Sequence, residues 1–572
     1  MKVSIVIATY NRQPTLARTL PTVLDQDFPA DRCELIVVLD GCSDSTRDYL
    51  RTVESKPGLI VLEQPHRGPA GARNAGILAA SGDLVMLLDD DMLCPRNLIS
   101  GHVAAHERMP GVLVFGPIFV AGESERSVAV NWLTLHGDRN TVGSNASPQT
   151  KYRAWATNCS VRRSALIAQG GYDQTLLTHE DADLGIRLWE AGVRFQFEPS
   201  LAIYELYDKT PRRLASVESA RLGRNEVLLC RKHPGYRSYS RQAHLRDRTL
   251  GSLFIWLACR FPVSPEPLLR PFQFLAEHLH TTRGEAQAMQ FFRCRLALEE
   301  VRGTHKESGS WRVFHEEFGL KLPVLRYGRR PGKDPFDTQG FWVDFESQVR
   351  SLKRRGYAGI RPSQWLEWVR EGKRLPARPV MITFDDAGSG VGDHAVPILR
   401  RHGFGAAVFV SGTSLSAAEA RQTDQSPGAS RSMSADEMRR CARGGIEFGV
   451  RPPDLAYSSA AAMEQEVLAG KHEVEDLIQS RVASFAYPNG LYSDNMRRWV
   501  EPAFDIAFTA EPGLNVLGTD LFRLRGSAIC AGDSWFDRMC LLRFGWRPAQ
   551  YLRTLRAGRG SWAKLKGGPI LS

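Results

Sequence analysis

Leu87-Leu88-Asp89-Asp90-Asp91-Met92 is the most informative run of residues in this chain. It reads as an apolar strand that ends in three consecutive carboxylates. Carboxylates this close together repel one another unless a divalent cation lies among them. The pattern therefore indicates a metal-bound diphosphate as the ligand. A solvated acidic turn after a strand is the alternative interpretation, and the surrounding sequence has to separate the two.

Strand-like segments with the same pattern come before this run. Residues 2–11 are largely β-branched and end in polar residues, and residues 34–44 repeat the pattern of an apolar strand with a polar tip. A helix-like stretch from residue 14 to about residue 25 separates them. Buried parallel strands have this composition and end at a ligand crevice, and alternating strands and helices indicate a doubly wound sheet. The sequence therefore predicts an α/β fold.

These segments together resemble the family 2 glycosyltransferases of the GT-A type. The run at residues 89–91 matches the Asp-x-Asp signature of that family, and residues 68–76 match its Ala-Arg-Asn-x-Gly segment. The resemblance implies a doubly wound nucleotide-sugar-binding domain and inverting transfer of a sugar from a nucleotide-sugar held through Mn2+ or Mg2+. A UDP-sugar is the donor that it implies first, while dTDP and GDP stay open.

The resemblance also implies roles for individual residues. Contacts to the nucleotide-sugar are implied for Tyr10, Asp40, Arg73, Asn74, Asp89 and Asp90. Metal ligation is implied for Asp89, Asp91 and Glu205, the last of which stands where the family often has a histidine. The chemistry agrees, because the imide N–H of a pyrimidine needs an acceptor and a flat base packs on an aromatic ring. Which of the three consecutive aspartates touch the metal stays open, with Asp91 as the first choice, and Asp40 as a helix cap is the non-functional interpretation.

A second group of carboxylates lies within residues 179–188 and matches the Glu-Asp acceptor motif of the same family. Inverting transfer needs a base that deprotonates the acceptor hydroxyl as it attacks. We assign that role to Asp181, with Glu180 and Asp183 as alternatives. Acids in the first turn of a helix are also favoured by the helix dipole, which is the non-catalytic interpretation of all three.

From about residue 324 the chain resembles the polysaccharide deacetylases of the NodB-homology type. Residues 345–357, 378–386, 484–490 and 508–513 carry this resemblance. It implies a second, (β/α) barrel domain in which Asp385 is the general base and Asp386 is a metal ligand.

The deacetylase chemistry is not carried over in full. Active members complete a Zn2+ site with two histidines of a His-x-x-x-His segment, because one aspartate alone does not hold the metal tightly. At that place this chain has Arg451 instead of the first histidine, and the second is lost in a shortening. We expect Arg451 to form a salt bridge with Asp386 in place of the metal. The domain is then degenerate and used for glycan recognition or support, and a working N-deacetylase in a bifunctional enzyme is the alternative.

Length and composition set the organisation. A chain of 572 residues is too long for one core. We predict a glycosyltransferase domain at residues 1–210, a helical extension and linker at 211–323 with a break near residues 303–309, and a deacetylase-like domain at 324–572. The ten cysteines are scattered without a Cys-x-x-Cys pair, so neither a disulfide framework nor a zinc ribbon is expected.

The expected location is the cytoplasm, because the first residues already form a strand and the best apolar run, residues 251–259, is too short to span a membrane. The formal net charge is +11, and much of the excess lies in one segment. Its basic residues are Arg212, Arg213, Arg221, Arg224, Arg231, Lys232, Arg237, Arg241 and Arg248. Peripheral contact with the inner face of a membrane, near a lipid-linked acceptor, is one interpretation. Solvated helix faces are the other.

No nucleic-acid-binding module accompanies the charge, so nucleic acid is not expected as a partner. The predicted acceptor is a glycan or a lipid-linked glycan in polysaccharide or glycoconjugate biosynthesis. The presence of a deacetylase-like domain favours amino-sugar glycans. A binding protein in which both sites are vestigial is the remaining hypothesis. Neither the sugar nor the acceptor follows from motif residues, because these recognise only what all nucleotide-sugars share.

Overall fold

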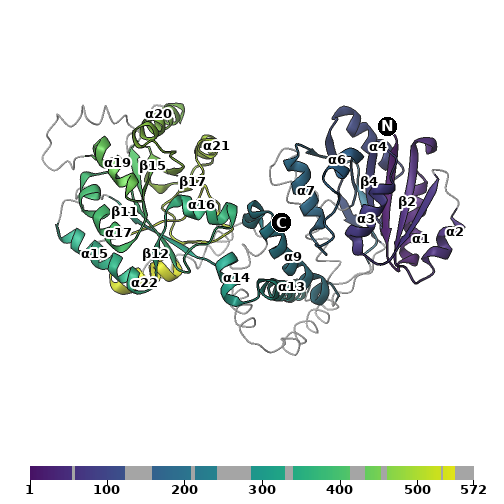
Figure 1. Cartoon of the computed structure of the whole chain (residues 1–572), viewed down its shortest axis with the longest axis horizontal. Coiled ribbons are helices and arrows are strands. Elements are labelled where there is room, and N and C mark those ends of the chain that lie inside the picture. The colour runs from purple at the N-terminus through teal and green to yellow at the C-terminus, as the bar shows by residue number, and fades with distance from the viewer. Residues whose placement is uncertain are drawn as a thin grey trace. The chain divides into compact units, whose positions relative to one another are not determined.

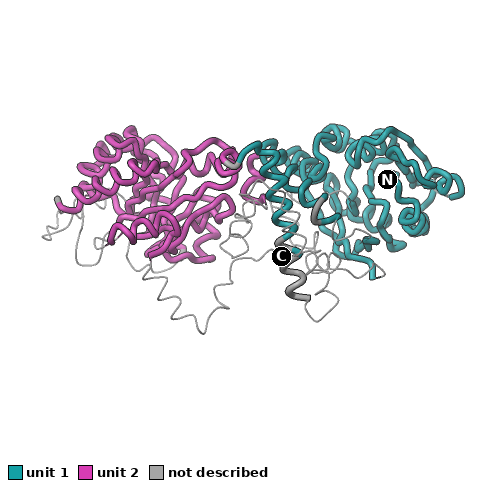
Figure 2. The backbone as a smooth tube through the Cα atoms, turned by 90° about the horizontal axis from the view of Figure 1, so that it is seen from below, with its two compact units in different colours: residues 1–233, 245–310, 569–572 teal, residues 234–244, 311–568 magenta. Residues whose placement is uncertain are grey.

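The computed structural model describes residues 1–53, 58–122, 157–207, 213–240, 285–328, 339–411, 432–452, 460–529 and 533–547 (Figure 1). The chain forms two compact units (Figure 2). Of the described residues, unit 1 contains 1–233 and 285–310, and unit 2 contains 234–240 and 311–547. The helical segment between the two predicted domains is therefore divided between the units.

Unit 1 is built on a seven-stranded sheet with the order β3-β2-β1-β4-β8-β6-β9. Its strands are β1 (Val3–Thr9), β2 (Cys33–Asp40), β3 (Leu59–Gln64), β4 (Leu84–Asp89), β6 (Val112–Phe115), β8 (Cys159–Arg162) and β9 (Arg194–Phe197). Strand β8 is antiparallel to β4 and β6, and the other neighbours are parallel. A small sheet of β5 (Met92–Leu93), β10 (Ile203–Glu205) and β7 (Ile118–Val120) lies beyond the end of β4.

Helices cover both faces of the large sheet, as a doubly wound fold requires (Figure 1). Side chains alternate along β1, so Ile5 and Ile7 pack with one helical layer and Val6 packs with the other. The first layer consists of α1 (Gln13–Leu24), α2 (Thr46–Thr52) and α4 (Leu98–Arg108), and the second of α3 (Gly68–Ala79), α6 (Arg163–Ala168) and α7 (Glu180–Glu190). The α/β prediction for this part of the chain is confirmed.

Two helices of unit 1 follow the sheet, after a short η3 (Leu214–Glu218). They are α9 (Ser219–Lys232) and α13 (Glu285–Ser308), which pack against each other. A side chain at Gly303 would overlap the carbonyl oxygen of Ala220, and one at Gly223 would overlap that of Glu300. The predicted break near residues 303–309 lies at the end of that range, because Gly303 serves this close packing inside a continuous helix. The helix ends at Ser308, and Gly309 has a positive φ of 80°.

Unit 2 contains a nine-stranded, largely parallel sheet whose main path is β17-β16-β15-β14-β13-β11-β18. These strands are β11 (Leu322–Tyr327), β13 (Pro379–Phe384), β14 (Ala406–Ser411), β15 (Ile446–Arg451), β16 (Ser484–Ala486), β17 (Ile506–Phe508) and β18 (Leu514–Asn515). Strand β12 (Ala358–Gly359) pairs with β13, and β19 (Ser527–Ala528) pairs with β11. The strands form a half-barrel, so the predicted second barrel-like domain is confirmed in its fold.

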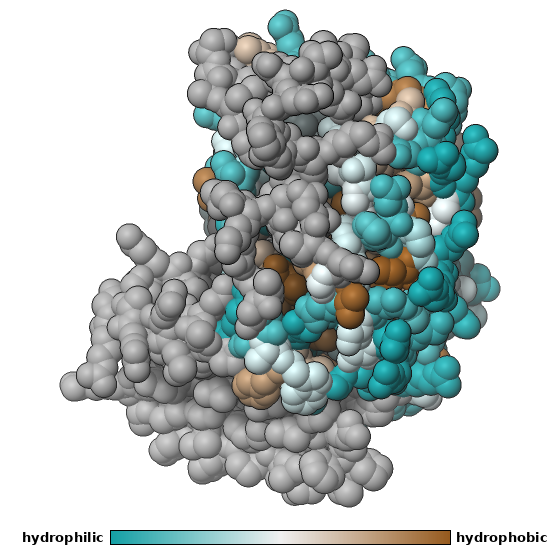
Figure 3. Space-filling view, turned by 90° about the vertical axis from the view of Figure 1, so that its left-hand side faces the viewer, coloured by the Kyte–Doolittle hydropathy of each residue, from teal (hydrophilic) through white to brown (hydrophobic). Residues whose placement is uncertain are grey.

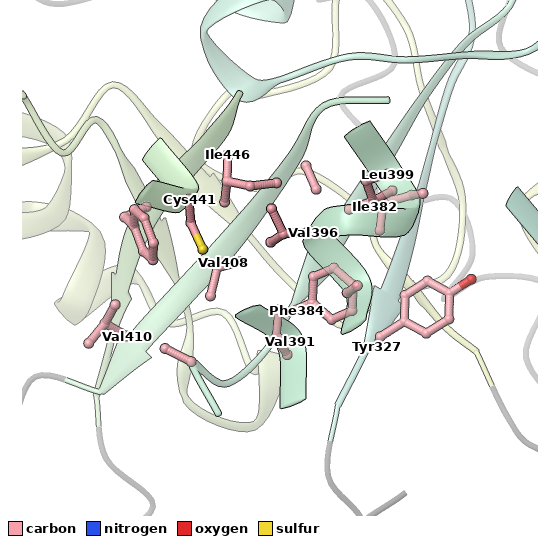
Figure 4. Packing of buried hydrophobic residues seen from close by; sticks show 14 of the residues in the cluster. Tyr327, Ile382, Phe384, Val391, Val396, Leu399, Val408, Val410, Cys441 and Ile446 are labelled. Atoms are coloured by element: carbon pink, nitrogen blue, oxygen red, sulfur yellow. The ribbon is translucent and has the colours of Figure 1, made fainter. Parts of the chain in front are cut away.

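Helices alternate with the strands of unit 2 and pack on them from outside (Figure 1). They include α15 (Gln339–Arg354), α16 (Pro362–Glu371), η6 (Val391–Ala395), α17 (Val396–His402), α19 (Ala435–Arg443), α20 (Ala460–Ile478), η7 (Pro488–Gly490), α21 (Asp494–Ala503) and α22 (Trp535–Phe544). Figure 4 shows the resulting core, in which Ile382 and Phe384 of β13 lie near Val396 and Leu399 of α17.

A short segment from the middle of the chain also belongs to unit 2. It is η4 (Pro234–Tyr239), which packs on α16. Arg237 of η4 is buried and lies over the ring of Trp368 at 5.3 Å and over that of Phe318, in α14 (Trp311–Phe318), at 5.8 Å. Arg237 is therefore not part of a basic surface.

Much of the predicted membrane-contact segment is not described. Arg212, Arg241, Arg248 and the apolar run at 251–259 lie outside the described residues. None of the helices within the described ranges is long and apolar enough to cross a membrane. On the face shown in Figure 3, hydrophilic residues cover most of the described surface, and hydrophobic residues appear between them in small groups.

Candidate active site

The acidic run follows the end of β4, at the edge where β1 and β2 also end. Asp90 is buried, and its carboxylate accepts a hydrogen bond from Thr9 Oγ1 at 2.6 Å and pairs with Arg12 Nη1 at 3.1 Å. Thr19 Oγ1 donates to its carbonyl oxygen at 2.9 Å. These partners fix the turn between β4 and β5, so they give Asp90 a structural role. Its predicted contact with the nucleotide-sugar stays a prediction.

Asp91 has the least favourable electrostatic surroundings of the three carboxylates in the run. Its Oδ2 accepts from Arg12 Nη1 at 2.9 Å, whereas Oδ1 is buried and receives no hydrogen bond from any described residue. Burial, together with the charges of Asp89 and Glu205, raises the pKa of Asp91 to about 8. Glu205 is close because its strand β10 pairs with β5, where it stands opposite Met92.

These residues fit a divalent cation by their chemistry. An unsatisfied, buried carboxylate oxygen with acidic neighbours is the donor that Mg2+ or Mn2+ prefers. The described residues contain no group of three His, Cys, Asp or Glu side chains already gathered as a metal site. In proteins, Mg2+ is usually held by one or two carboxylates plus substrate phosphates and water.

Arg73 joins the two acidic clusters. Its Nη2 donates to Asp89 Oδ1 at 2.8 Å and its Nη1 donates to Glu180 Oε1 at 2.9 Å, although Glu180 is 107 residues further along the chain. The guanidinium is buried and lies over the ring of Tyr172 at 5.5 Å. The end of β4 and the first turn of α7 therefore meet at one edge of the sheet, as a shared reaction centre requires.

The three acids in the first turn of α7 differ sharply in their surroundings. Glu180 is buried on Arg73, and its burial together with the charge of Asp181 raises the pKa of Glu180 to about 7. Asp183 is fully buried and accepts from His233 Nε2 at 2.7 Å, and it pairs with Lys232 at 2.8 Å. Asp181 is only partly buried, and its Oδ1 accepts from the backbone N–H of Ala182. Asp181 is therefore the acid of this first turn that is least committed to other side chains.

Helix α9 supports the start of α7 from the side. Although burial alone would raise it, hydrogen bonds from His233, Lys232 and Arg187 hold the pKa of Asp183 well below its ordinary value. His179, which precedes α7 with a positive φ of 66°, pairs through Nε2 with the buried Glu226 of α9 at 2.9 Å. This support was not predictable from the sequence, because nothing in its pattern links α9 to α7.

Asp40 and Asn74 are both occupied by contacts within the protein. Asp40 is buried, and it accepts from the backbone N–H groups of Arg67 and Gly68, each at 2.9 Å, at the start of α3. Asn74 exchanges two hydrogen bonds with the backbone of Tyr172, at 2.7 and 2.8 Å. Asp40 therefore caps α3, whereas the capping interpretation concerned the next helix along the chain, α2. Asn74 shapes the site by holding the loop that carries Tyr172.

Tyr10 lies exposed at the same edge and stacks on a residue that the sequence did not single out, His66. Their ring centres are 4.2 Å apart with an angle of 29° between the planes. His66 Nδ1 lies 2.8 Å from Asp40 Oδ2. Arg12, which neutralises Asp90 and Asp91, was also missed. The signal available for Arg12 was its place directly after the polar end of the first strand.

In unit 2 the paired acids lie just beyond β13, as predicted, and Arg326 neutralises the first of them. Arg326 of β11 donates to Asp385 through Nη2 at 2.8 Å and through Nε at 3.3 Å. Arg451 ends β15, which is separated from β13 by β14. The predicted pairing of Arg451 with Asp386 stays a prediction.

The three histidines that follow Asp386 in the chain lie on different helices or turns of unit 2. His394 stacks on Trp342 with ring centres 5.4 Å apart, and His402 ends α17 beside Glu346. His472 is exposed on α20. All cysteines that the structure describes are free thiols, in agreement with the absence of a disulfide framework from the sequence interpretation.

Comparison with known families agrees with this division. Residues 4–169 match the family described as glycosyl transferase family 2, and residues 372–503 match polysaccharide deacetylase. The chain therefore carries a family 2 glycosyltransferase domain of the GT-A type followed by a polysaccharide deacetylase domain.

Individual curated relatives match part of the chain. The pre-mycofactocin glycosyltransferase of Mycobacterium tuberculosis is 28% identical over 239 residues, which are 41% of this chain and 48% of that protein. The poly-beta-1,6-N-acetyl-D-glucosamine synthase of Staphylococcus aureus is 28% identical over 217 residues, 36% of this chain and 50% of that protein. The chain thus spans about half the length of these curated relatives.

Solved structures resemble each half. The Streptococcus pyogenes deacetylase PplD in complex with acetate is 22% identical and covers 40% of this chain and 98% of its own, with a TM-score of 0.33. The structure of S. aureus TarS 1-349 in complex with UDP-GlcNAc is 14% identical and covers 54% of this chain and 93% of its own, with a TM-score of 0.34.

Proposed function

We propose that unit 1 is a metal-dependent, inverting glycosyltransferase that acts on a nucleotide-sugar and a glycan or lipid-linked acceptor. The observation that carries the proposal is the double contact of Arg73 with Asp89 and Glu180, because it brings a diphosphate-binding acidic edge and a candidate catalytic helix to one place. A vestigial binding protein does not need a buried carboxylate oxygen without a partner, which Asp91 has.

In this proposal Asp181 deprotonates the acceptor hydroxyl, because it is the least committed acid in the first turn of α7 and lies next to the residue that Arg73 holds. Arg73 fixes the distance between the two acidic clusters. Asp91, with Asp89 and Glu205 as further oxygen donors, would hold Mg2+ or Mn2+. The ion would neutralise the charge that develops on the departing nucleoside diphosphate. Arg12, already beside Asp91, supplies a positive charge at the same edge.

The donor that we propose to test first is UDP-GlcNAc. A similar relative is by name a poly-beta-1,6-N-acetyl-D-glucosamine synthase, and the second domain belongs to a family that by its name acts on polysaccharide acetyl groups. The product would be a glycosidic bond in an amino-sugar polysaccharide or a related glycoconjugate. We keep the cytoplasmic side of the membrane as the proposed location.

Binding of the donor is expected to stabilise the wild-type protein only when the metal is present. At a concentration about 100 times the dissociation constant, a ligand adds about 2.7 kcal/mol to the stability of the state that it binds. We therefore expect UDP-GlcNAc with Mn2+ to raise the thermal unfolding temperature of unit 1 by several degrees, and UDP-GlcNAc with EDTA to leave it unchanged. Differential scanning fluorimetry over a panel of nucleotide-sugars measures this.

The matched pair of variants for that experiment is Asp91→Asn and Asp48→Asn. Asp91→Asn is expected to abolish the metal-dependent shift, whereas Asp48 lies exposed on α2 and its replacement is expected to keep it. If UDP-GlcNAc with Mn2+ raises the unfolding temperature of wild type and Asp91→Asn equally, Asp91 is not part of the metal site. No protection of the wild type by any nucleotide-sugar would overturn the proposed function.

For unit 2 we propose a degenerate deacetylase domain that recognises or supports the glycan. A general base must be free to take a proton, whereas both carboxylate oxygens of Asp385 accept hydrogen bonds from Arg326. Of the histidines that follow Asp386 in the chain, His394 stacks on Trp342, His402 lies beside Glu346 and His472 is exposed.

We therefore expect no acetate release from oligomers of N-acetylglucosamine, with or without added Zn2+. Wild type and Asp385→Asn should give the same background in an enzymatic acetate assay. Metal-dependent release by the wild type that disappears in Asp385→Asn would contradict this expectation and would instead establish the bifunctional alternative.

A further inference from the structure

Asp40, the residue expected to bind the base of the donor, has no capacity left for it. Its Oδ1 accepts from Gln64 Nε2 at 2.7 Å and from the N–H of Arg67 at 2.9 Å. Its Oδ2 accepts from the N–H of Gly68 at 2.9 Å and lies 2.8 Å from His66 Nδ1. A carboxylate offers about four lone-pair positions, so these contacts use all of them. A base could bind Asp40 only by displacing a cap of α3.

His66 is directed by that same carboxylate. A carboxylate can only accept, so Nδ1 carries the hydrogen of the neutral imidazole and Nε2 is left as an acceptor. The His66 side chain is 54% exposed, whereas that of Asp40 is 4% exposed, so Nε2 lies on the solvent side of the pair. A side chain at Gly41 would come within 2.8 Å of the His66 backbone nitrogen. The close approach of Gly41 therefore fixes the backbone of His66 as well.

The surroundings of His66 suit a flat ring. Tyr10, stacked on His66, is 46% exposed and offers an aromatic wall. An open hollow of about 290 Å³ lies at the ends of β2 and β3, and its lining includes Gly41, Cys42, Gln64 and Pro65. These residues flank Asp40 and His66 in the chain, although Tyr10, Asp40 and His66 do not themselves line the hollow. The acceptor, the aromatic wall and the hollow all lie where β1, β2 and β3 end.

We propose that His66, and not Asp40, reads the base of the donor nucleotide, by accepting a ring N–H through Nε2. This rests on the proposed function and narrows its substrate class. Uracil and thymine carry such a hydrogen on N3 and guanine carries it on N1, whereas the corresponding nitrogens of cytosine and adenine are acceptors. His66 is therefore a specificity-determining residue that favours donors with an imide-type base over CDP- and ADP-sugars.

The test compares UDP with CDP in the presence of MnCl2 by isothermal titration calorimetry on the full chain. The wild type is expected to bind UDP at least about tenfold more tightly, since a site built around an acceptor rejects a base without the matching N–H. His66→Phe keeps an aromatic ring against Tyr10 but removes Nε2, so the two affinities should become equal within about threefold. His66→Ala removes the ring as well and should weaken both nucleotides while leaving them equal.

The matched control is His472→Phe, the same substitution at an exposed histidine of unit 2, which should keep the preference for UDP. A preference for UDP that survives in both His66→Phe and His66→Ala would overturn the inference, and so would a wild type that binds UDP and CDP equally. If the wild type binds neither nucleotide with Mn2+, the proposed function itself fails and takes this inference with it.

Discussion

Replacing Asp181 with asparagine is expected to lower the rate constant of sugar transfer by about 10²–10⁴-fold, the range that a positioned general base contributes. Asparagine keeps the shape of the side chain but does not take a proton. Asp181 is partly exposed and holds only a local backbone contact, so the fold should be unchanged. Donor binding should also be unchanged, because the metal and nucleotide contacts lie on the β-strand edge. Initial rates of transfer and the thermal shift with UDP-GlcNAc and Mn2+ measure the two effects separately.

The control for this change is Glu190→Gln, which alters the exposed last residue of the same helix and is expected to keep the wild-type rate. Glu180→Gln distinguishes the remaining alternative. If Glu180→Gln loses more activity than Asp181→Asn while its unfolding temperature is preserved, the base is Glu180. If Asp181→Asn transfers sugar at the wild-type rate, the catalytic assignment is wrong.

Replacing Arg73 with methionine is expected to destabilise unit 1 by about 3–5 kcal/mol, because it leaves a buried carboxylate without its counter-charge. Methionine fills a similar volume, so the loss should come from charge and hydrogen bonding. Glu180 would lose its cation inside the protein, and Asp89 would lose the partner that joins it to α7. A decrease of roughly 10 °C in the unfolding temperature follows for a unit of this size. Transfer should be lost as well, because the two halves of the site are no longer held together.

Two further variants serve as comparisons for Arg73→Met. Arg73→Lys keeps the charge but does not span both carboxylates, and its loss should therefore be smaller. Arg194→Met removes an exposed arginine that lies over Trp189 at 4.7 Å, and it should change the unfolding temperature by only a few degrees. An Arg73→Met protein that unfolds at the wild-type temperature would show that the bridge between the acidic clusters does not stabilise the site.

The sequence predicted what depends on short, regular patterns. The strands that end at Thr9, Asp40 and Asp89 were recognisable, because each is a continuous apolar run with a polar end. The placement of the acids of α7 at the same edge followed from their match to a known family motif. In unit 2 the strand that ends before Asp385 was found in the same way.

The partners of those acids were not predictable, because they come from segments that only the fold brings together. Arg326 and Asp385 are 59 residues apart and meet because β11 and β13 are neighbours in the sheet. Asp40 receives its contacts from the turn that follows β3. A capping role could be predicted from the residue type alone, but neither α3 as the capped helix nor His66 as a partner could be predicted in this way. Local sequence patterns do not show which strands are neighbours in the folded sheet.

Two glycines show why the break between helices could be predicted only within a range of residues. Glycine is common where helices end, so both Gly303 and Gly309 were candidates for the break near residues 303–309. Inside α13 the absence of a side chain instead lets the backbone approach Ala220 of α9. Local preference and tertiary packing thus give opposite interpretations of the same residue, and packing decides. Only the glycine at 309, with its positive φ, acts as a terminator.

The path of the chain through η4 has a practical consequence for anyone who wishes to study the halves separately. A gene truncated near residue 324 would encode the deacetylase-like half without Pro234–Tyr239, and Trp368 would lose the arginine that covers it. An expression fragment that starts there would expose this aromatic ring to water and would be prone to aggregate. The two compact units of this polypeptide alternate along the chain, so a single cut does not separate them.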